Sequence, residues 1–283
     1  MKKILLFAAA AAVLFPLASC QKDELKNSVK DSAGDEIILS LADGSIDMSV
    51  ATKATEINAI PASLNLARTT GALKSEASAN ASASFTVSSG KISTGWYQTA
   101  TATTYNYYVS NAALTFAAGG STVVADNATD IIAGVASSNS ATPGVTLNHV
   151  FARTATLTCN TQSGYDISNV SWKIQSKSGG TGGTKGTYNV ASGAWSGVTA
   201  LPSTGITSSS DLYLIPGVYT VSVTYTLSKN EYSQTFTKSG DVTLVAGKLN
   251  SITCTAIGGN ASEISLSVSL SAWGTNSCTL TFN

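Results

Sequence analysis

The sequence predicts an all-β protein built from two antiparallel β-sandwich domains. Apolar and hydroxyl residues alternate without a break along 219–227, a pattern that a half-buried antiparallel strand requires and a helix cannot use. Short alternating segments of the same kind recur between turn residues, which is typical of a β-sandwich. Outside the N-terminal segment no stretch keeps an apolar period of about 3.6 residues, so we expect helices to be few and short.

The composition supports the same fold class and excludes some partners. Charged residues make up 11% of the 283 residues and the formal net charge is +0, whereas about 25% charged residues is typical. Polarity comes instead from Ser, Thr, Asn and Gly, which suit strands and turns. We therefore expect no nucleic-acid partner and no membrane attachment through charge alone, because both need an excess of positive charge.

The first residues have the layout of a signal peptide. Lys2 and Lys3 form a basic start, and the apolar run 4–17 is shorter than the roughly 20 residues that cross a bilayer. The run ends in Leu-Ala-Ser-Cys, which resembles the lipobox of bacterial lipoproteins. The resemblance implies a signal peptide over 1–19 and attachment to the outer membrane through lipid on Cys20. The alternative is a secreted protein without lipid.

A tether and a first strand follow this segment. Residues 21–34 are polar and charged with no apolar period, which indicates a flexible tether, and 21–24 resemble the acidic signal that sends Bacteroidota lipoproteins to the cell surface. Strand-like segments then occupy 36–41 and 46–50, joined by an Asp-Gly turn that favours hairpins. We assign 20–53 to the tether and this first strand.

Two domains are expected after residue 53, of Greek-key, transthyretin-like or immunoglobulin-like topology. Pro143 and Gly144 interrupt any strand in 137–144, which is the best boundary in the chain. We place an N-terminal domain at 54–146 and a C-terminal domain at 147–283. The candidate strands are 83–87, 105–109, 112–117 and 130–136 in the first domain, and 151–159, 170–174, 219–227, 232–236, 249–256, 264–270 and 278–282 in the second.

Three cysteines remain once Cys20 is acylated, so at least one of them is unpaired in a monomer. Cys159, Cys254 and Cys278 each fall on the apolar face of a predicted strand. We interpret them as small core residues. A disulfide between two of them is the alternative.

The sequence carries little that points to chemistry. It has one histidine, His149, and no Cys-x-x-Cys, so we expect no metal site. The glycine-rich stretch 179–186 lacks the Gly-Lys-Ser/Thr of a phosphate loop, and we interpret it as a mobile hairpin loop. There is no Gly-x-Ser-x-Gly and no arranged pair of carboxylates. Neither enzymatic activity nor a cofactor is therefore expected.

Neighbouring aromatic residues raise the possibility of a carbohydrate platform. Trp96, Tyr97, Tyr105 and Tyr107 lie close in sequence, and their rings could stack on the apolar faces of sugars. Packing in the core is the simpler interpretation of the same residues.

The second half of the chain resembles the fimbrillin family, the lipoprotein-derived subunits of Bacteroidota fimbriae. The resemblance rests on Leu-Asn-His-Val-Phe-Ala-Arg at 147–153, Tyr-Leu-Ile-Pro-Gly at 213–217, Ala-Gly-Lys at 246–248 and the segment 264–274, which ends in Ser-Ala-Trp-Gly. Ala-Thr-Lys-Ala-Thr at 51–55 stands where such proteins often carry a Thr-Arg-Ala-Thr-like segment.

The family resemblance implies assembly by strand addition. A protease removes the lipid and the first strand after a basic residue, and a strand of the next subunit fills the vacated groove. Here the resemblance implies that 37–50 is removable, with cleavage after Lys53 or after Arg68. It implies a donor strand in 263–283, whose apolar face consists of Ile264, Leu266, Val268 and Leu270. Because the family prefers arginine at the cut, an uncleaved anchor or accessory subunit is the alternative.

We therefore expect a non-enzymatic structural or accessory subunit of a cell-surface fimbria that supports adhesion. Its partners would be other fimbrial subunits, and its location the cell outer membrane, or the fimbrium after processing. The rival hypothesis is a surface glycan-binding lipoprotein for nutrient capture.

Overall fold

The computed structural model confirms the all-β fold. Strands and turns make up the described part of the chain, which contains no helix and hence no helix that could span a membrane. Most strand pairs are antiparallel, and three are parallel. The described residues are 35–44, 57, 59–70, 74–75, 84–98, 104–117, 120–155, 157–161, 164–207, 212–257, 263–272 and 277–281.

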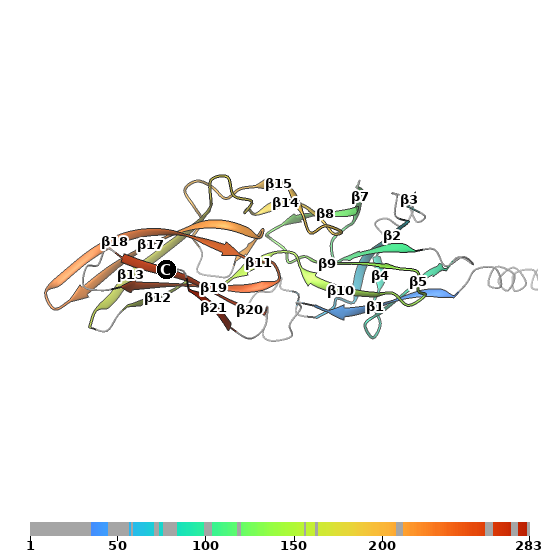
Figure 1. Cartoon of the computed structure of the whole chain (residues 1–283), viewed down its shortest axis with the longest axis horizontal. Helices are drawn as coiled ribbons and strands as arrows, with labels where there is room; N and C mark the ends of the chain where they lie inside the picture. Colours follow the sequence, from blue (N-terminus) through green and yellow to red (C-terminus); the bar gives the residue numbers. More distant parts are fainter. Residues whose placement is uncertain are drawn as a thin grey trace, which may run out of the picture.

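The molecule is elongated, with the N-terminal strands at one end and the C-terminal strands at the other (Figure 1). One eight-stranded sheet dominates the N-terminal end, with the order β3-β2-β6-β9-β10-β1-β5 and with β4 paired to β2. Its strands are β1 (Glu36–Asp43), β2 (Ser63–Thr70), β3 (Lys74–Ser75), β4 (Ser84–Thr86), β5 (Lys91–Tyr97), β6 (Tyr105–Ser110), β9 (Ile132–Ser138) and β10 (Gly144–His149).

The segment 137–144, which the sequence indicates as a domain boundary, lies within this sheet. It ends β9, turns, and begins β10, and the two strands pair antiparallel with Asn148 opposite Ala133. Proline and glycine interrupt a strand equally well at a turn and at a linker. The sequence pattern alone therefore does not distinguish a turn within a sheet from a linker between domains.

A four-stranded sheet, of order β15-β14-β8-β7, covers one face of the eight-stranded sheet. Its strands are β7 (Thr115–Ala117), β8 (Gly120–Asp126), β14 (Lys185–Asn189) and β15 (Trp195–Thr199). The hairpin β14–β15 comes from the second half of the chain and pairs with β8 of the first, with Tyr188 opposite Val123. The two halves therefore share a sheet across the boundary expected between residues 146 and 147.

The buried cluster between these two sheets also draws on both halves. Ala67, Tyr108 and Val123 come from the first half, and Phe151 and Tyr213 from the second. Apolar residues on both sides of residue 146 therefore leave water together, which couples the halves energetically.

The C-terminal end is a sandwich of a six-stranded and a three-stranded sheet. The first has the order β16-β11-β19-β20-β21, with β12 paired to β19, and the second has the order β13-β17-β18. The strands are β11 (Ala152–Thr154), β12 (Thr158–Thr161), β16 (Leu212–Leu214), β19 (Lys248–Ile257), β20 (Glu263–Ala272) and β21 (Ser277–Thr281), with β13 (Asp166–Ser176), β17 (Gly217–Lys229) and β18 (Tyr232–Leu244).

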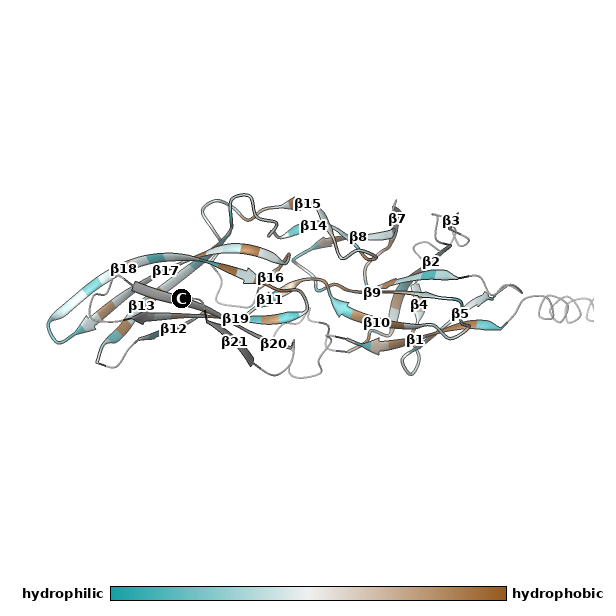
Figure 2. Cartoon of the chain, in the orientation of Figure 1, coloured by the Kyte–Doolittle hydropathy of each residue, from teal (hydrophilic) through white to brown (hydrophobic). Residues whose placement is uncertain are grey.

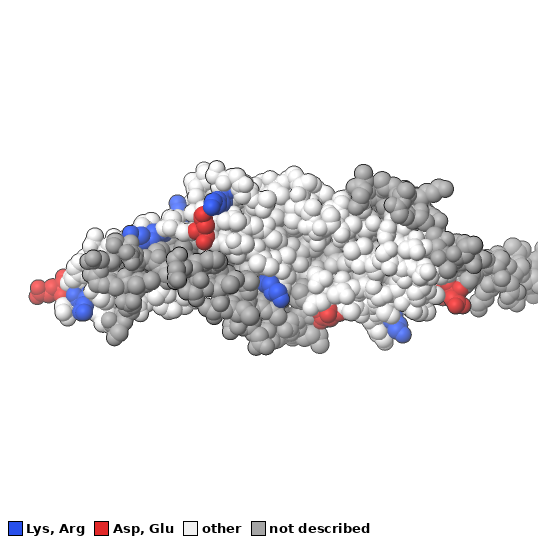
Figure 3. Space-filling view, viewed as in Figure 1, with Lys and Arg blue, Asp and Glu red and all other residues white. Residues whose placement is uncertain are grey.

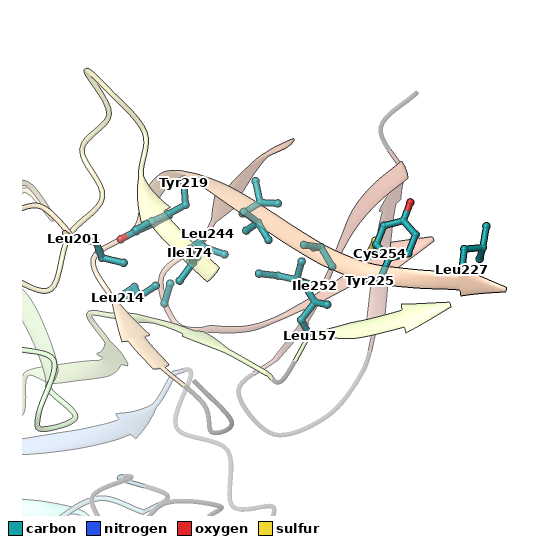
Figure 4. Close-up of a cluster of buried hydrophobic side chains, with 14 residues drawn as sticks. Leu157, Ile174, Leu201, Leu214, Tyr219, Tyr225, Leu227, Leu244, Ile252 and Cys254 are labelled. Carbon is teal, nitrogen blue, oxygen red and sulfur yellow. The ribbon is translucent and has the colours of Figure 1, made fainter. Parts of the chain in front are cut away.

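Strand β17 confirms the alternation that predicted the fold. Every second residue from Tyr219 to Leu227 is buried in the cluster between the two sheets (Figure 4). The intervening hydroxyl residues face β18 on the outer side, where Ser222 bonds Ser239 (2.6 Å) and Thr224 bonds Thr237 (2.8 Å). Bands of hydrophobic and hydrophilic residues follow one another along this hairpin in Figure 2. The period of two thus separates core from surface.

The glycine-rich stretch connects β13 to β14, which lie in different sheets, so the expectation of a hairpin loop is wrong. Residues 179–181 are exposed, whereas the next two are packed. Gly182 and Gly183 are buried beside Tyr219. The Tyr219 hydroxyl donates to the carbonyl of Ile215 (2.5 Å) and lies 3.3 Å from that of Gly183. A Cβ on Gly182 would overlap the tyrosine ring. The glycines are needed because the chain passes too close to the ring for a side chain.

Candidate functional site

Strand β1 is an inner strand of the N-terminal sheet. It pairs parallel with β10, with Ser40 opposite Gly144, and antiparallel with β5, with Leu39 opposite Ile92. Backbone N–H groups of β1 donate to carbonyls more than a hundred residues away, as Ser40 does to Pro143 (2.9 Å). We call β1 with its two neighbours, β5 and β10, the first-strand site.

Apolar side chains of β1 fill the floor of the first-strand site. Ile37 and Leu39 are fully buried, and Leu41 is half-buried against the same cluster. They pack in one cluster with Ile92 of β5 and with Val145 and Leu147 of β10. Burying the first two side chains stabilises the fold by about 5 kcal/mol as an upper bound.

Polar contacts fix the first residues of β1 on β5. The Glu36 carboxylate accepts a hydrogen bond from the Ser93 hydroxyl and one from the Gly95 N–H (3.2 Å). The Thr94 hydroxyl donates to the carbonyl of Ile37 (2.8 Å). These bonds hold β1 in one register on β5. The register matters because a slip of one residue would turn the apolar side chains of β1 away from the core.

The sheet curls so that the strands at its two ends touch beside the first-strand site. Arg68 of β2 places its guanidinium 4.9 Å from the Trp96 ring centroid of β5 and 4.3 Å from that of Tyr105. The Phe85 ring of β4 meets Trp96 edge-on at 5.5 Å. Cation–π and aromatic contacts therefore close the layer in which β1 lies.

Arg68, one of the two processing candidates, is poorly accessible to a protease in the folded protein. It is 7% exposed and lies opposite Tyr107 in β2, a strand paired on both sides. Proteases cut exposed loop tips far more readily than paired strands. The other candidate, Lys53, and the lipidation candidate, Cys20, both lie outside the described residues.

Most of the aromatic residues proposed for glycan contact belong to the core. Tyr105 and Tyr107 are buried, with ring centroids 6.3 Å apart. Burial raises the pKa of Tyr107 to about 12, although the charge of Arg68 acts in the opposite direction. Trp96 is half-buried, and Tyr97 is 38% exposed. Glycan contact through Tyr105 and Tyr107 is therefore wrong, and these four residues do not form an exposed row.

The candidate donor strand pairs within its own domain. Strand β20 runs antiparallel to β19 from Lys248 opposite Ala272 to Ile257 opposite Glu263, and β21 pairs with its other side. Together β20 and β21 form the edge hairpin of the six-stranded sheet. The donor candidates Ile264, Leu266, Val268 and Leu270 all lie on β20, opposite Ala256, Cys254, Ile252 and Asn250.

Charges are sparse and scattered on the molecular face in Figure 3. Among the described residues no group of three or more His, Cys, Asp or Glu side chains could hold a metal ion. His149 pairs with Asp130 in the interior.

Sequence reasoning missed both strands that flank β1, namely β5 and β10. The sequence pattern places 147–153 at the start of a second domain, whereas Leu147 and His149 belong to β10. The signal was present, because residues 145, 147 and 149 are the buried positions of an alternating strand. It did not reveal which strand β10 pairs with.

No protein-family model and no curated protein matches the chain. Among solved structures, a proposed cell adhesion protein of Parabacteroides distasonis is 12% identical over 86% of this chain and 98% of its own, with a TM-score of 0.48. A fimbrial assembly protein of the same species is 10% identical over 87% and 98%, with a TM-score of 0.46. A proposed cell adhesion protein of Bacteroides uniformis is 15% identical over 84% and 98%, with a TM-score of 0.45. At these values the likeness does not assign a function to the chain.

Proposed function

We propose that the chain is a structural or accessory subunit of a cell-surface fimbria, exported as a lipoprotein through Cys20 and assembled by strand addition. One observation carries this proposal: the first strand of the described fold is an inner strand with a buried apolar face. Such a strand leaves two hydrogen-bonding edges and an apolar floor when it is removed, and another extended chain restores both.

The position of β1 in the chain makes its removal feasible. Only the segment that contains Lys53 joins β1 to β2, and residues before β1 belong to the predicted tether. A cut after Lys53 therefore frees β1 from the remaining covalent fold. The exposed edges would then be those of β10, which β1 meets in parallel, and β5, which it meets antiparallel.

The proposed donor segment has the same apolar period as the strand that it would replace. In β1 the buried or half-buried apolar residues are 37, 39 and 41, and in β20 residues 264, 266, 268 and 270 are apolar with serine between them. Because β20 and β21 lie at the sheet edge, freeing β20 breaks only its pairs with β19 and β21. Inserting β20 between β5 and β10 of another subunit would compensate for the pairing lost on both of its edges.

Limited proteolysis of the lipidated protein tests this proposal. The full mature chain in detergent is treated with trypsin, and its oligomers are resolved by electrophoresis with and without heating. We expect a new N-terminus at Ala54 by mass spectrometry, together with a heat-sensitive ladder. Lys53→Ala should abolish both, whereas Lys30→Ala, which removes a tether site upstream of β1, should leave both unchanged.

Two results would contradict the proposal. Protein that begins at Ala54 and stays monomeric would show that loss of β1 does not open an acceptor site. A ladder from Lys53→Ala protein that still carries β1 would show that subunits associate by another route. A new N-terminus at Thr69 would instead show that trypsin cuts after Arg68, which requires local opening of β2.

A further inference from the structure

Cys159 and Cys254 lie directly opposite one another on neighbouring parallel strands. Thr158 of β12 pairs with Thr253 of β19, and Cys159 with Cys254. Neighbouring strands are about 4.8 Å apart, and disulfides join residues whose Cα atoms are about 4.4–6.8 Å apart. Residues opposite each other in a sheet also project from the same face, so the backbone suits a disulfide between these two.

The two thiols contact each other at the rim of the C-terminal core. Cys254 is fully buried beside Tyr225 and Ile252 (Figure 4), whereas Cys159 is half-buried and packs against the same cluster. A hydrogen bond from Cys254 lowers the pKa of the Cys159 thiol, and the same bond, together with burial, raises the pKa of Cys254. The more accessible thiol is thus the better nucleophile.

We propose that Cys159 and Cys254 form an intramolecular disulfide when the chain meets a disulfide oxidant, either a small-molecule disulfide or a protein dithiol–disulfide exchanger. The Cys159 thiolate attacks one sulfur of the oxidant, which makes a mixed disulfide and releases one thiolate. Cys254 then loses its proton and attacks the Cys159 sulfur, which releases the second thiolate. The oxidant gains two electrons and, with the two protons from the cysteines, becomes two thiols.

The disulfide would fasten a strand that little else holds. Strand β12 has four residues and pairs only with β19 among the described strands. Cross-linking residues 159 and 254 closes a loop that contains β13 to β18. Long loops restrict the unfolded chain most, so this cross-link should stabilise the C-terminal half strongly. Exported proteins meet the oxidising conditions that such a bond requires.

Cys278 lies too far from Cys254 along the sheet to compete with Cys159 for a disulfide. It lies opposite Leu270 of β20, and Leu270 lies opposite Asn250 of β19. Cys254 instead lies opposite Leu266. The backbone register therefore separates Cys278 from Cys254 by a strand and by several residues along it. The proposed disulfide joins β19 to β12 and not to β20, so it requires neither removal of β1 nor release of β20.

Peptide mapping of the full lipidated chain tests the disulfide. The protein is incubated with glutathione disulfide, blocked with N-ethylmaleimide, and digested with trypsin and a glutamate-specific protease, which cuts after Glu263 and separates Cys254 from Cys278. We expect a peptide that joins Cys159 to Cys254 and is lighter by two hydrogen atoms than the sum of its parts. Cys278→Ser should give the same peptide.

Melting curves provide the second measurement. Oxidised wild-type and Cys278→Ser proteins should melt roughly 5 to 15 °C above their reduced forms. In Cys159→Ser, which alters only the half-buried thiol, the oxidised and reduced samples should have the same Tm. Maleimide on both Cys159 and Cys254 after oxidation, a bond from Cys159 to Cys278, or a linked peptide without any rise in Tm would overturn the proposal.

Discussion

Nδ1 of His149 lies 2.9 Å from Oδ1 of Asp130, and both side chains are fully buried. The other carboxylate oxygen of Asp130 accepts a hydrogen bond from the backbone N–H of Ile57 (2.9 Å). One carboxylate thus connects the end of β10 with the segment that leads into β2. The single histidine of the chain therefore lies in the interior beside a carboxylate partner.

Asp130→Ala should lower the free energy of unfolding by about 3 kcal/mol, because it leaves the Ile57 N–H and the imidazole without their buried acceptor. Urea denaturation followed by fluorescence measures the loss. Asp241→Ala is the matched control, since it breaks a pair with Lys177 (2.6 Å) whose side chains are 43% and 47% exposed. That loss should stay below about 1 kcal/mol. Equal losses would refute a special role for the buried carboxylate.

The contact between Arg68 and Trp96 should appear as a coupling energy. Arg68→Met and Trp96→Leu, made singly and together, should give a double-mutant coupling of about 1 kcal/mol in urea denaturation, because the guanidinium is largely shielded from water between two rings. Lys229 lies 4.8 Å from the Tyr165 ring at an exposed end of β17. The same cycle on that pair should give a smaller value. A coupling near zero at Arg68 would mean that the guanidinium does not hold the ends of the sheet together.

The strands themselves were largely predictable, because alternation is a local property. Residues 219–227 and 249–256 alternate as the core requires, and both lie in observed strands. Strand partners depend on residues far along the chain and leave no local trace. The hairpin β14–β15 therefore looked like part of the second domain, although its partner is β8.

In the candidate site, too, a strand was predictable from the sequence but its partners were not. The strand at 36–41 was expected from its sequence and is observed as β1, but its neighbours β5 and β10 were not identified. The tyrosines of β6 were harder to interpret, because clusters cover both faces of that strand: Tyr105 and Tyr107 pack in one and Tyr108 in another. A strand buried on both faces does not alternate, so exposure could not be inferred from its pattern.

Gly183→Ala should destabilise the protein by about 2 kcal/mol. A Cβ at this position would overlap the backbone carbonyl of Thr199, which no side-chain rotation can relieve. Gly144→Ala is the control, because a Cβ there meets nothing within 4 Å. Thermal unfolding followed by circular dichroism should show a clear loss for the first variant and almost none for the second. Similar Tm values for the two would mean that the loop before β14 yields easily.

Tyr107→Phe should protect the fold at alkaline pH. The pKa of Tyr107 in the folded state is about 12 against an ordinary value of 10.0, so the folded chain keeps its proton where the unfolded chain loses it. The stabilisation that the raised pKa of Tyr107 gives to the fold is fully present below pH 10 and is lost as the pH rises toward 12. Urea midpoints measured across this range should fall less steeply for Tyr107→Phe than for the wild type. Urea midpoints that fall equally steeply with pH in the two proteins would contradict a raised pKa of Tyr107 in the folded state.

Trp195→Ala should loosen the middle of the molecule and spare its C-terminal end. The Trp195 ring lies 5.4 Å from that of Phe151 and 5.1 Å from that of Tyr188, next to the turn of the hairpin that pairs with β8. Truncating the ring should cost about 3 kcal/mol. Where amides exchange by local opening, exchange in β8 and β14 should then accelerate by about a hundredfold, while β17 and β18 remain protected.

Trp172→Ala is the matched control for this experiment, because Trp172 packs against the cluster between the two C-terminal sheets. Hydrogen–deuterium exchange with mass spectrometry should show the reverse pattern, with faster exchange in β13 and β17 and little change in β8. If Trp195→Ala instead raised exchange in the hairpin alone and left β8 protected, β8 would not depend on β14. The first half of the chain would then be a self-sufficient domain, as the expected boundary at residue 146 requires.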